Sequence, residues 1–204
     1  MTSELVQPTP RSGQDYNGVF GLIAVNIVLF VIDKWLSLPL EWLYLDHANP
    51  QWYQFVTSTV LHANWAHLSG NLFFLYIFGK LIEEEEGILG VVGTYLITGI
   101  GANLASIVIQ RGPIVSLGAS GAVFGLFAVS VLVKLSLNWR SILEVLILGQ
   151  FVIGRVLGEV QQVGMQDGIN RIAHLGGAMA GVILVLGLRQ LESRLADEDD
   201  APLV

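Results

Sequence analysis

The stretch from residue 116 to residue 137 reads SLGASGAVFGLFAVSVLVKLSL and decides how the whole chain is interpreted. From Ser120 onward it is apolar enough to lie in lipid, and it opens on a serine between Gly118 and Gly121. The four-residue spacing of Gly121 and Gly125 is typical of helices that pack closely in membranes. A hydroxyl in the first turn of such a helix lies beside free backbone N–H groups and the positive end of the helix dipole. The stretch therefore predicts a membrane helix with either a nucleophile or a small-residue packing face at its start.

The composition is that of an integral membrane protein. The chain has 204 residues, of which 53% are hydrophobic and 13% are charged, whereas soluble domains carry roughly 25% charged residues. The absence of cysteine excludes disulfides, thiol catalysis and Cys-ligated metals. The sequence has no basic patch of the kind that would indicate nucleic acid as a partner. We expect neither a cofactor nor a metal.

Six apolar segments account for most of the chain, at about 20 residues for each crossing of the bilayer. Five of them cover residues 18–38, 63–82, 88–109, 141–160 and 172–188, and the fourth in chain order begins at Ser120. We expect an all-α bundle of six transmembrane helices over 18–190, with a cytoplasmic segment at 1–17 and an acidic, disordered tail at 191–204. The N-terminal segment lacks the form of a signal peptide. The aromatic-rich connection at 39–55 is expected to lie in the membrane interface.

Three of the predicted helices carry a polar side chain at the same depth. Counted from the basic residue that closes each helix, His67, Ser120 and His174 all lie roughly 20–22 Å away along the helix axis. Asn71 lies one turn deeper than His67 on the same face. Polar groups at membrane depth are costly and indicate function, so this shared level is the predicted site.

Matched glycines on two helices predict how the site closes. The fourth and sixth helices carry the pairs Gly121 with Gly125 and Gly177 with Gly181. These pairs allow the two helices to touch backbone to backbone, which would bring the Ser120 hydroxyl within reach of His174, as a Ser/His pair requires. Phe124 lies one turn below Ser120 and is expected to pack either against this imidazole or in the ordinary core.

These residues resemble the rhomboid family of intramembrane serine proteases. The match rests on GASGAVFG at 118–125, on His174 followed by two glycines, and on His62, His67 and Asn71, in the right order over 56–188. The resemblance implies that Ser120 is the nucleophile and His174 the general base. It also implies an oxyanion hole of His67, Asn71 and the Ser120 amide. The supporting residues it implies are His62, Gly118, Gly121, Phe124, Gly125, Gly177 and Gly181.

The resemblance also implies the substrates and the membrane. Single-span membrane proteins, surrounded by lipid, would be cut near the outer end of their transmembrane helix. The stretch 67–86 looks most like cyanobacterial and chloroplast members, which implies a bacterial inner, thylakoid or plastid membrane. One departure is that Trp42 is followed by Leu43, where many members have a Trp-Arg pair. No acidic residue has a claim to orient His174, so a Ser/His dyad is expected.

Other interpretations remain open at this point. A non-catalytic rhomboid-like protein that binds membrane clients would usually lack the serine or the histidine. A small transporter or channel is disfavoured because the chain shows no internal repeat. The acidic run at 83–86 is interpreted as a solvated surface. Asn64, Ser69 and the loop at 161–170 are expected to line a wet cavity.

Overall fold

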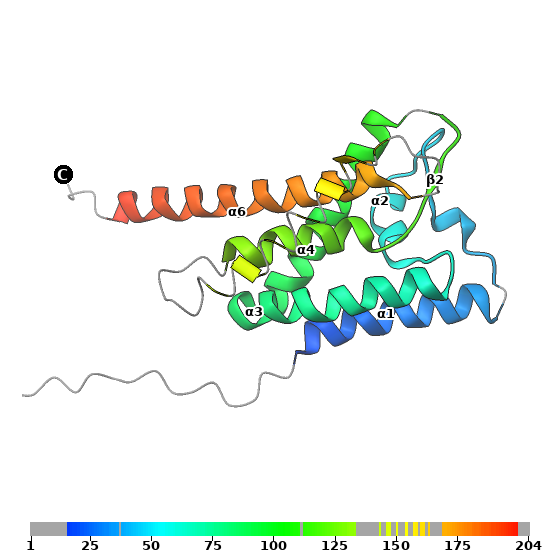
Figure 1. Ribbon diagram of the computed structural model, residues 1–204, viewed down its shortest axis with the longest axis horizontal. Helices are drawn as coiled ribbons and strands as arrows, with labels where there is room; N and C mark the ends of the chain where they lie inside the picture. The colour runs from blue at the N-terminus through cyan, green and yellow to red at the C-terminus, as the bar shows by residue number, and fades with distance from the viewer. Residues whose placement is uncertain are drawn as a thin grey trace, which may run out of the picture.

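The computed structural model describes residues 16–36, 38–110, 112–133 and 169–199, together with isolated positions between 143 and 163. Helix α4 (Ser120–Val133) lies between α3 (Trp65–Ile109) and α6 (Arg171–Asp199), and α1 (Asn17–Lys34) packs against α3 (Figure 1). Within the described ranges, three helical segments are long and apolar enough to cross a membrane, namely α1, α3 and Arg171–Ala196. The fifth predicted helix falls mostly outside the described residues, as does the segment 1–15, and the six-helix count stays a prediction.

Helix α3 reverses its direction at Gly87, where the backbone leaves the helical region (φ 72°, ψ −172°). A positive φ of this kind is accessible to glycine at little cost because glycine has no Cβ. The two arms, residues 65–86 and 88–109, are each about 33 Å long at 1.5 Å per residue. Each arm is therefore long enough to cross a hydrocarbon layer of about 30 Å, and the arms match the second and third predicted helices.

The first turn of α1 and the last turn of α6 lie at the same end of the molecule (Figure 1). Helix α6 continues to Asp199, so the predicted disorder of the tail is wrong for residues 191–199. The physical reason is that this stretch holds good helix formers such as Leu191, Glu192 and Leu195 and no glycine or proline. Residues 200–204 lie outside the described part of the chain.

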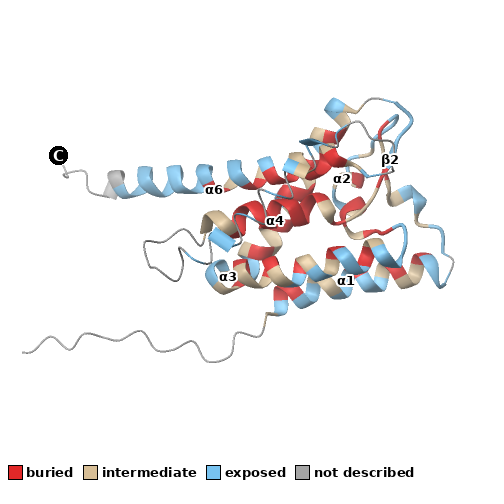
Figure 2. Ribbon diagram, in the orientation of Figure 1, coloured by how far each residue is buried: buried red, intermediate tan, exposed pale blue. Residues whose placement is uncertain are grey.

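Helix α4 is the centre of the hydrophobic core. Every residue from Gly121 to Ser130 is buried (Figure 2), as expected for a helix that is apolar all round its circumference. Phe127 contacts the Phe78 ring of α3 at 4.2 Å between ring centroids. Tyr95 of the second arm is fully buried and donates a hydrogen bond to the Thr59 carbonyl oxygen at 2.8 Å. The first residue of α4, Ser120, is thereby fixed to the best-packed part of the bundle.

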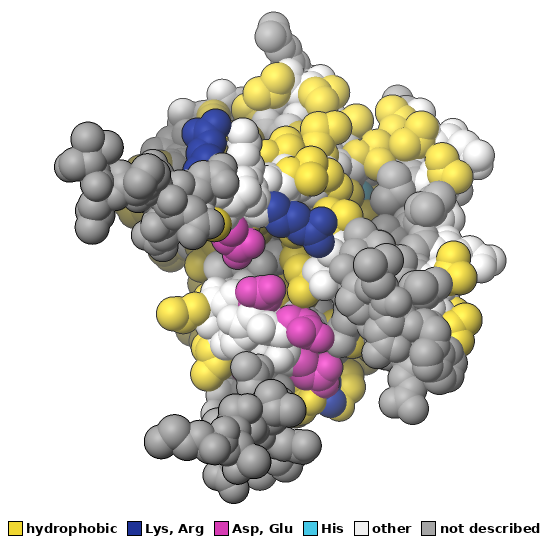
Figure 3. Space-filling model, turned by 90° about the vertical axis from the view of Figure 1, so that its left-hand side faces the viewer, with side chains coloured by type: hydrophobic (Ala, Val, Ile, Leu, Met, Phe, Trp, Pro, Cys, Tyr) yellow, Lys and Arg dark blue, Asp and Glu magenta, His cyan; other side chains and the backbone are white. Residues whose placement is uncertain are grey.

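Two members of the acidic run are structural, which contradicts the predicted solvated surface. Glu83 is 2% exposed, and its carboxylate accepts hydrogen bonds from the backbone N–H groups of Gly18 at 2.9 Å and Val19 at 2.8 Å. Glu84 accepts a bond from the Tyr16 hydroxyl at 2.5 Å. The first N–H groups of a helix have no acceptor within it, so Glu83 supplies one for α1. Acidic and basic side chains gather on this end of the molecule (Figure 3).

A small antiparallel sheet, which the sequence did not predict, lies at the opposite end. Strand β1 (Leu45–Asp46) pairs with β2 (Val115–Ser116), with Leu45 opposite Ser116. The first loop, which contains β1, is completed by η1 (Glu41–Leu43), α2 (Gln54–Thr57) and η2 (Ser58–Val60). The sheet ties this loop to the strand that leads into Ser120.

Candidate active site

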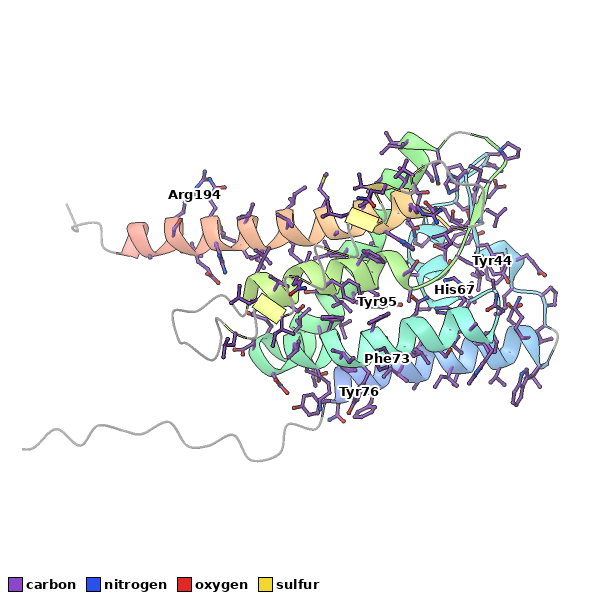
Figure 4. The ribbon with its side chains drawn as sticks, in the orientation of Figure 1. Tyr44, His67, Phe73, Tyr76, Tyr95 and Arg194 are labelled. Atoms are coloured by element: carbon purple, nitrogen blue, oxygen red, sulfur yellow. The ribbon has the colours of Figure 1, made fainter. Side chains whose placement is uncertain are left out.

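A cavity of about 670 Å³ opens at the end of the bundle that carries the sheet. Ser120, His174, His67 and Asn71 all line it, together with Phe124. These side chains come from the starts of α4 and α6 and from the first arm of α3. His67 lies at this end of its arm, whereas Tyr76 lies far along the arm toward the charged end (Figure 4). The structure thus brings together the polar residues that the sequence assigned to one depth.

The loop before Ser120 requires glycine at position 118. Gly118 has a φ of +128°, a conformation that other residues rarely adopt. A Cβ added there would lie 2.6 Å from Cε1 of His67, so the imidazole packs directly against the loop backbone. The Gly118 N–H donates to the Ser58 carbonyl oxygen at 2.8 Å. Glycine therefore allows both the turn into α4 and the approach of His67.

His174 is held by an aromatic ring of α4. The rings of Phe124 and His174 are stacked, with their centroids 4.5 Å apart and an interplanar angle of 7°. Both residues are less than a tenth exposed. Of the two alternatives predicted for Phe124, the structure shows packing against this imidazole, which restricts rotation of the His174 ring.

The predicted backbone contact between α4 and α6 is also confirmed. Gly177 lies directly against the backbone of Gly121, where an added Cβ would be 2.7 Å from the Gly121 carbonyl carbon. A Cβ on Gly181 would be 2.7 Å from the carbonyl oxygen of Gly125. Real Cβ atoms essentially never come within 3.0 Å of another heavy atom, so neither position of α6 has room for a side chain.

The glycines of α4 serve a second contact that was not predicted. An added Cβ on Gly121 would collide with Ala102, and one on Gly125 would collide with Thr98. Both of these neighbours lie on the second arm of α3. Small residues therefore close the packing of α4 against α3 and α6 simultaneously.

Asn71 offers a hydrogen-bond donor to the cavity. The residue is 7% exposed, and its Nδ2 atom is buried with no hydrogen-bond partner among the described residues. Buried polar groups in folded proteins are nearly always satisfied. His67, one turn earlier, lines the same cavity and is half-buried. His67 and Asn71 therefore line the same cavity from successive turns of one helix.

His62 lies beneath the Ser120 loop and is fully buried. Its Nε2 accepts a hydrogen bond from the Ala119 N–H at 3.4 Å, and its ring meets that of His67 edge to face at 5.0 Å. Burial, with a smaller effect from the charge of His67, lowers the pKa of His62 to about 3. The neutral ring can accept the Ala119 bond, which the protonated ring cannot.

Several cavity residues escaped prediction. Asn64 lines the cavity as expected, but Ser69 does not and donates to the Ala66 carbonyl oxygen instead. Asn170, the last residue of the loop at 161–170, lines it as expected, and most of that loop lies outside the described residues. Ser116 and Gln110 line it without having been predicted. The N-cap role of Asn170 was not predicted, although an asparagine directly before an apolar helix is typical of an N-cap. Within the described ranges, no three metal-binding side chains lie close enough to hold an ion.

Comparison with known proteins identifies the family. A model described as the Rhomboid domain matches residues 49–191. Rhomboid-like protein 11, chloroplastic, from Arabidopsis thaliana is 53% identical over 90% of this chain and 69% of its own length. RHOMBOID-like protein 6, mitochondrial, from the same plant is 33% identical over 71% of this chain, but this chain spans only 46% of that protein. Rhomboid protease AarA of Providencia stuartii is 29% identical over 80% of this chain and 69% of its own length.

The matched region contains α3, α4 and nearly all of the apolar part of α6, and with them every residue that lines the cavity. The chain is a membrane protein of the rhomboid family.

Proposed function

We propose that this chain is an intramembrane serine endopeptidase, with Ser120 as its nucleophile and His174 as its general base. The observation that carries the proposal is the convergence of Ser120, His174, His67 and Asn71 on one cavity inside a bundle of apolar helices. The name of the Providencia relative as a rhomboid protease supports it.

Peptide hydrolysis follows the general logic of serine proteases. His174 takes the proton of the Ser120 hydroxyl as Oγ forms a bond to the substrate carbonyl carbon. The imidazolium then gives that proton to the leaving amine as the C–N bond breaks. A water molecule releases the acyl group by the same route, again with His174 as base. Stacking on Phe124 keeps the imidazole oriented through these steps, and no acidic side chain is required.

His67, Asn71 and the Ser120 backbone amide form the proposed oxyanion hole. Among the described residues the buried Asn71 Nδ2 has no acceptor, which supports this role because a carbonyl oxygen that gains negative charge would satisfy it. Removing one such donor typically costs about 2.7–4 kcal/mol of transition-state stabilisation. His62 supports the hole indirectly through its bond to the Ala119 N–H.

The proposed substrates are single-span membrane proteins cut near the outer end of their transmembrane helix. A helix shields its own carbonyl groups by hydrogen bonding, so a substrate segment must unwind before it can reach Ser120. The polar cavity walls at Gln110, Ser116 and Asn170 would hold the water that hydrolysis consumes. The similarity to a chloroplastic protein supports a plastid membrane as the location.

The decisive experiment compares purified wild type in detergent with Ser120→Ala and His174→Ala on a model single-span substrate. We expect cleavage, and labelling of Ser120 by a fluorophosphonate, only with the wild type. Asn71→Ala should keep substrate affinity and lose turnover by roughly a hundredfold. Substrate binding without cleavage by the wild type would favour a non-catalytic client-binding protein, and equal cleavage by wild type and Ser120→Ala would refute the protease.

A further inference from the structure

A network of polar side chains, three of which line the cavity, joins four separate segments of the chain. Its members are His47 after β1, Ser106 and Gln110 at the end of α3, Ser116 of β2, and Asn170 before α6. They are joined by bonds of 2.7–3.1 Å, of which the bond from His47 ends on the Gln110 backbone carbonyl oxygen. A longer contact of 3.4 Å lies between His47 and Ser106.

The position of every proton in this network follows from its partners. Nδ1 of His47 lies 3.1 Å from the Gln110 carbonyl oxygen, which can only accept, so Nδ1 carries the proton. Nε2 is then an acceptor and takes the Ser116 hydroxyl at 2.9 Å. The Ser106 hydroxyl donates to Gln110 Oε1 at 3.0 Å. The side-chain amide of Asn170 donates both of its N–H groups, one to Ser106 Oγ at 2.7 Å and one to Ser116 Oγ at 2.9 Å.

Asn170 connects the two segments that carry the reacting side chains. Its Oδ1 accepts the Ala173 N–H at 3.0 Å, which is an N-cap bond for α6, and its carbonyl oxygen accepts the His174 N–H at 3.2 Å. Its Nδ2 holds Ser116, four residues before Ser120. One side chain thus ties the start of the His174 helix to the strand that leads into the Ser120 loop.

We propose that Asn170 is a positioning residue, which sets the separation of Ser120 and His174 by bridging α6 to β2, with His47 fixing the bridge. This inference rests on the proposed protease function. His47 accepts a hydrogen bond from the Ser116 hydroxyl, and this bond turns the lone pairs of Ser116 Oγ toward the Asn170 amide. The bridge joins residues that precede both helices, whereas the glycine contacts hold α4 and α6 together only from Gly121 and Gly177 onward. A shift of about 1 Å at a reacting group can cost roughly a hundredfold in rate.

Substitutions can separate this bridge from the helix cap. Asn170→Ser keeps an oxygen that can cap α6 but removes both amide donors. Ser116→Ala breaks the bridge from the other side. We expect each variant to lower turnover roughly tenfold or more without a matching change in KM, and to slow fluorophosphonate labelling of Ser120 in parallel. Ser116→Thr keeps the hydroxyl and should restore turnover, which a loss of general stability would not explain.

The double variant gives the sharpest result. If the two residues act through one bond, Asn170→Ser with Ser116→Ala should be no slower than the slower single variant. Ser193→Ala, at the exposed end of α6, is the control and should behave as wild type. Multiplied losses in the double variant, or wild-type labelling in both single variants, overturn the bridge alone. A wild type that neither cleaves nor labels overturns the protease function, and this inference with it.

Discussion

Replacing Gly177 by alanine tests whether the contact between α4 and α6 sets the geometry of the site. A Cβ at Gly181 would be 2.7 Å from the Gly125 carbonyl oxygen, about 0.7 Å short of ordinary contact at 3.4 Å. At Gly177 the added methyl would overlap the Gly121 carbonyl group, and the helices would have to separate by more than about 1 Å. His174 lies one turn before Gly177, so moving α6 away from α4 would lengthen the distance between His174 and Ser120. We expect Gly177→Ala to lose roughly a hundredfold in cleavage rate.

The assay must distinguish misplacement from unfolding. Overpacking costs about 1–3 kcal/mol on its own account, so the thermal midpoint in detergent is measured beside the cleavage rate. Gly181→Ala should show a smaller loss than Gly177→Ala, in keeping with its smaller overlap. Gly187→Ala is the matched control on the same helix, because an added Cβ there meets nothing within 4 Å. The reasoning is refuted if Gly177→Ala cleaves at the rate of Gly187→Ala.

Three further perturbations test other parts of the structure. Glu83→Ala should lower the thermal midpoint far more than Glu86→Ala, because it leaves two buried N–H donors without an acceptor. Each such donor costs about 1–3 kcal/mol of stability, and equal midpoints would contradict the capping role. His62 has a pKa of about 3 in the folded protein against 6.5 unfolded, so its contribution to stability is complete above pH 6.5. That contribution is lost between pH 6.5 and 3 at about 1.4 kcal/mol per pH unit, and His62→Gln should flatten the pH dependence of unfolding. Gly70→Leu fills open space at the cavity wall and should raise KM without lowering the thermal midpoint, whereas Gly21→Leu on α1, also in open space, should change neither.

The features predicted correctly depend on patterns that persist along the chain. Apolar runs of membrane length indicated α1 and both arms of α3, because every backbone polar group in lipid must be satisfied within the segment. The four-residue glycine spacing on α4 and α6 indicated their contact, since small residues on one face allow backbones to meet. Packing of Phe124 against the imidazole was one of two predicted alternatives, because residues four apart share a helix face.

The features that were missed depend on contacts between distant residues. Glu83 stands in a run of four glutamates, and nothing local marks it as the acceptor for N–H groups 64 and 65 residues earlier. Strands β1 and β2 have two residues each, too few for any alternation of polar and apolar side chains. His47 is a single polar residue in an aromatic-rich loop, and only the folded chain brings it to Ser116.

The reversal of α3 at Gly87 limits how the length of this protein can vary in evolution. The two arms follow each other with one non-helical residue between them, so no loop is available to absorb an insertion or a deletion. Losing one residue between Asn71 and Gly87 would turn the outer part of the first arm by about 100° relative to the reversal. His67 and Asn71 would then face away from the cavity, although no residue of the site had changed. A change of about one turn would restore the facing but move both residues about 5.4 Å along the axis, so the length of this part of α3 is restricted, whereas substitutions on its lipid-facing surface are not restricted in this way.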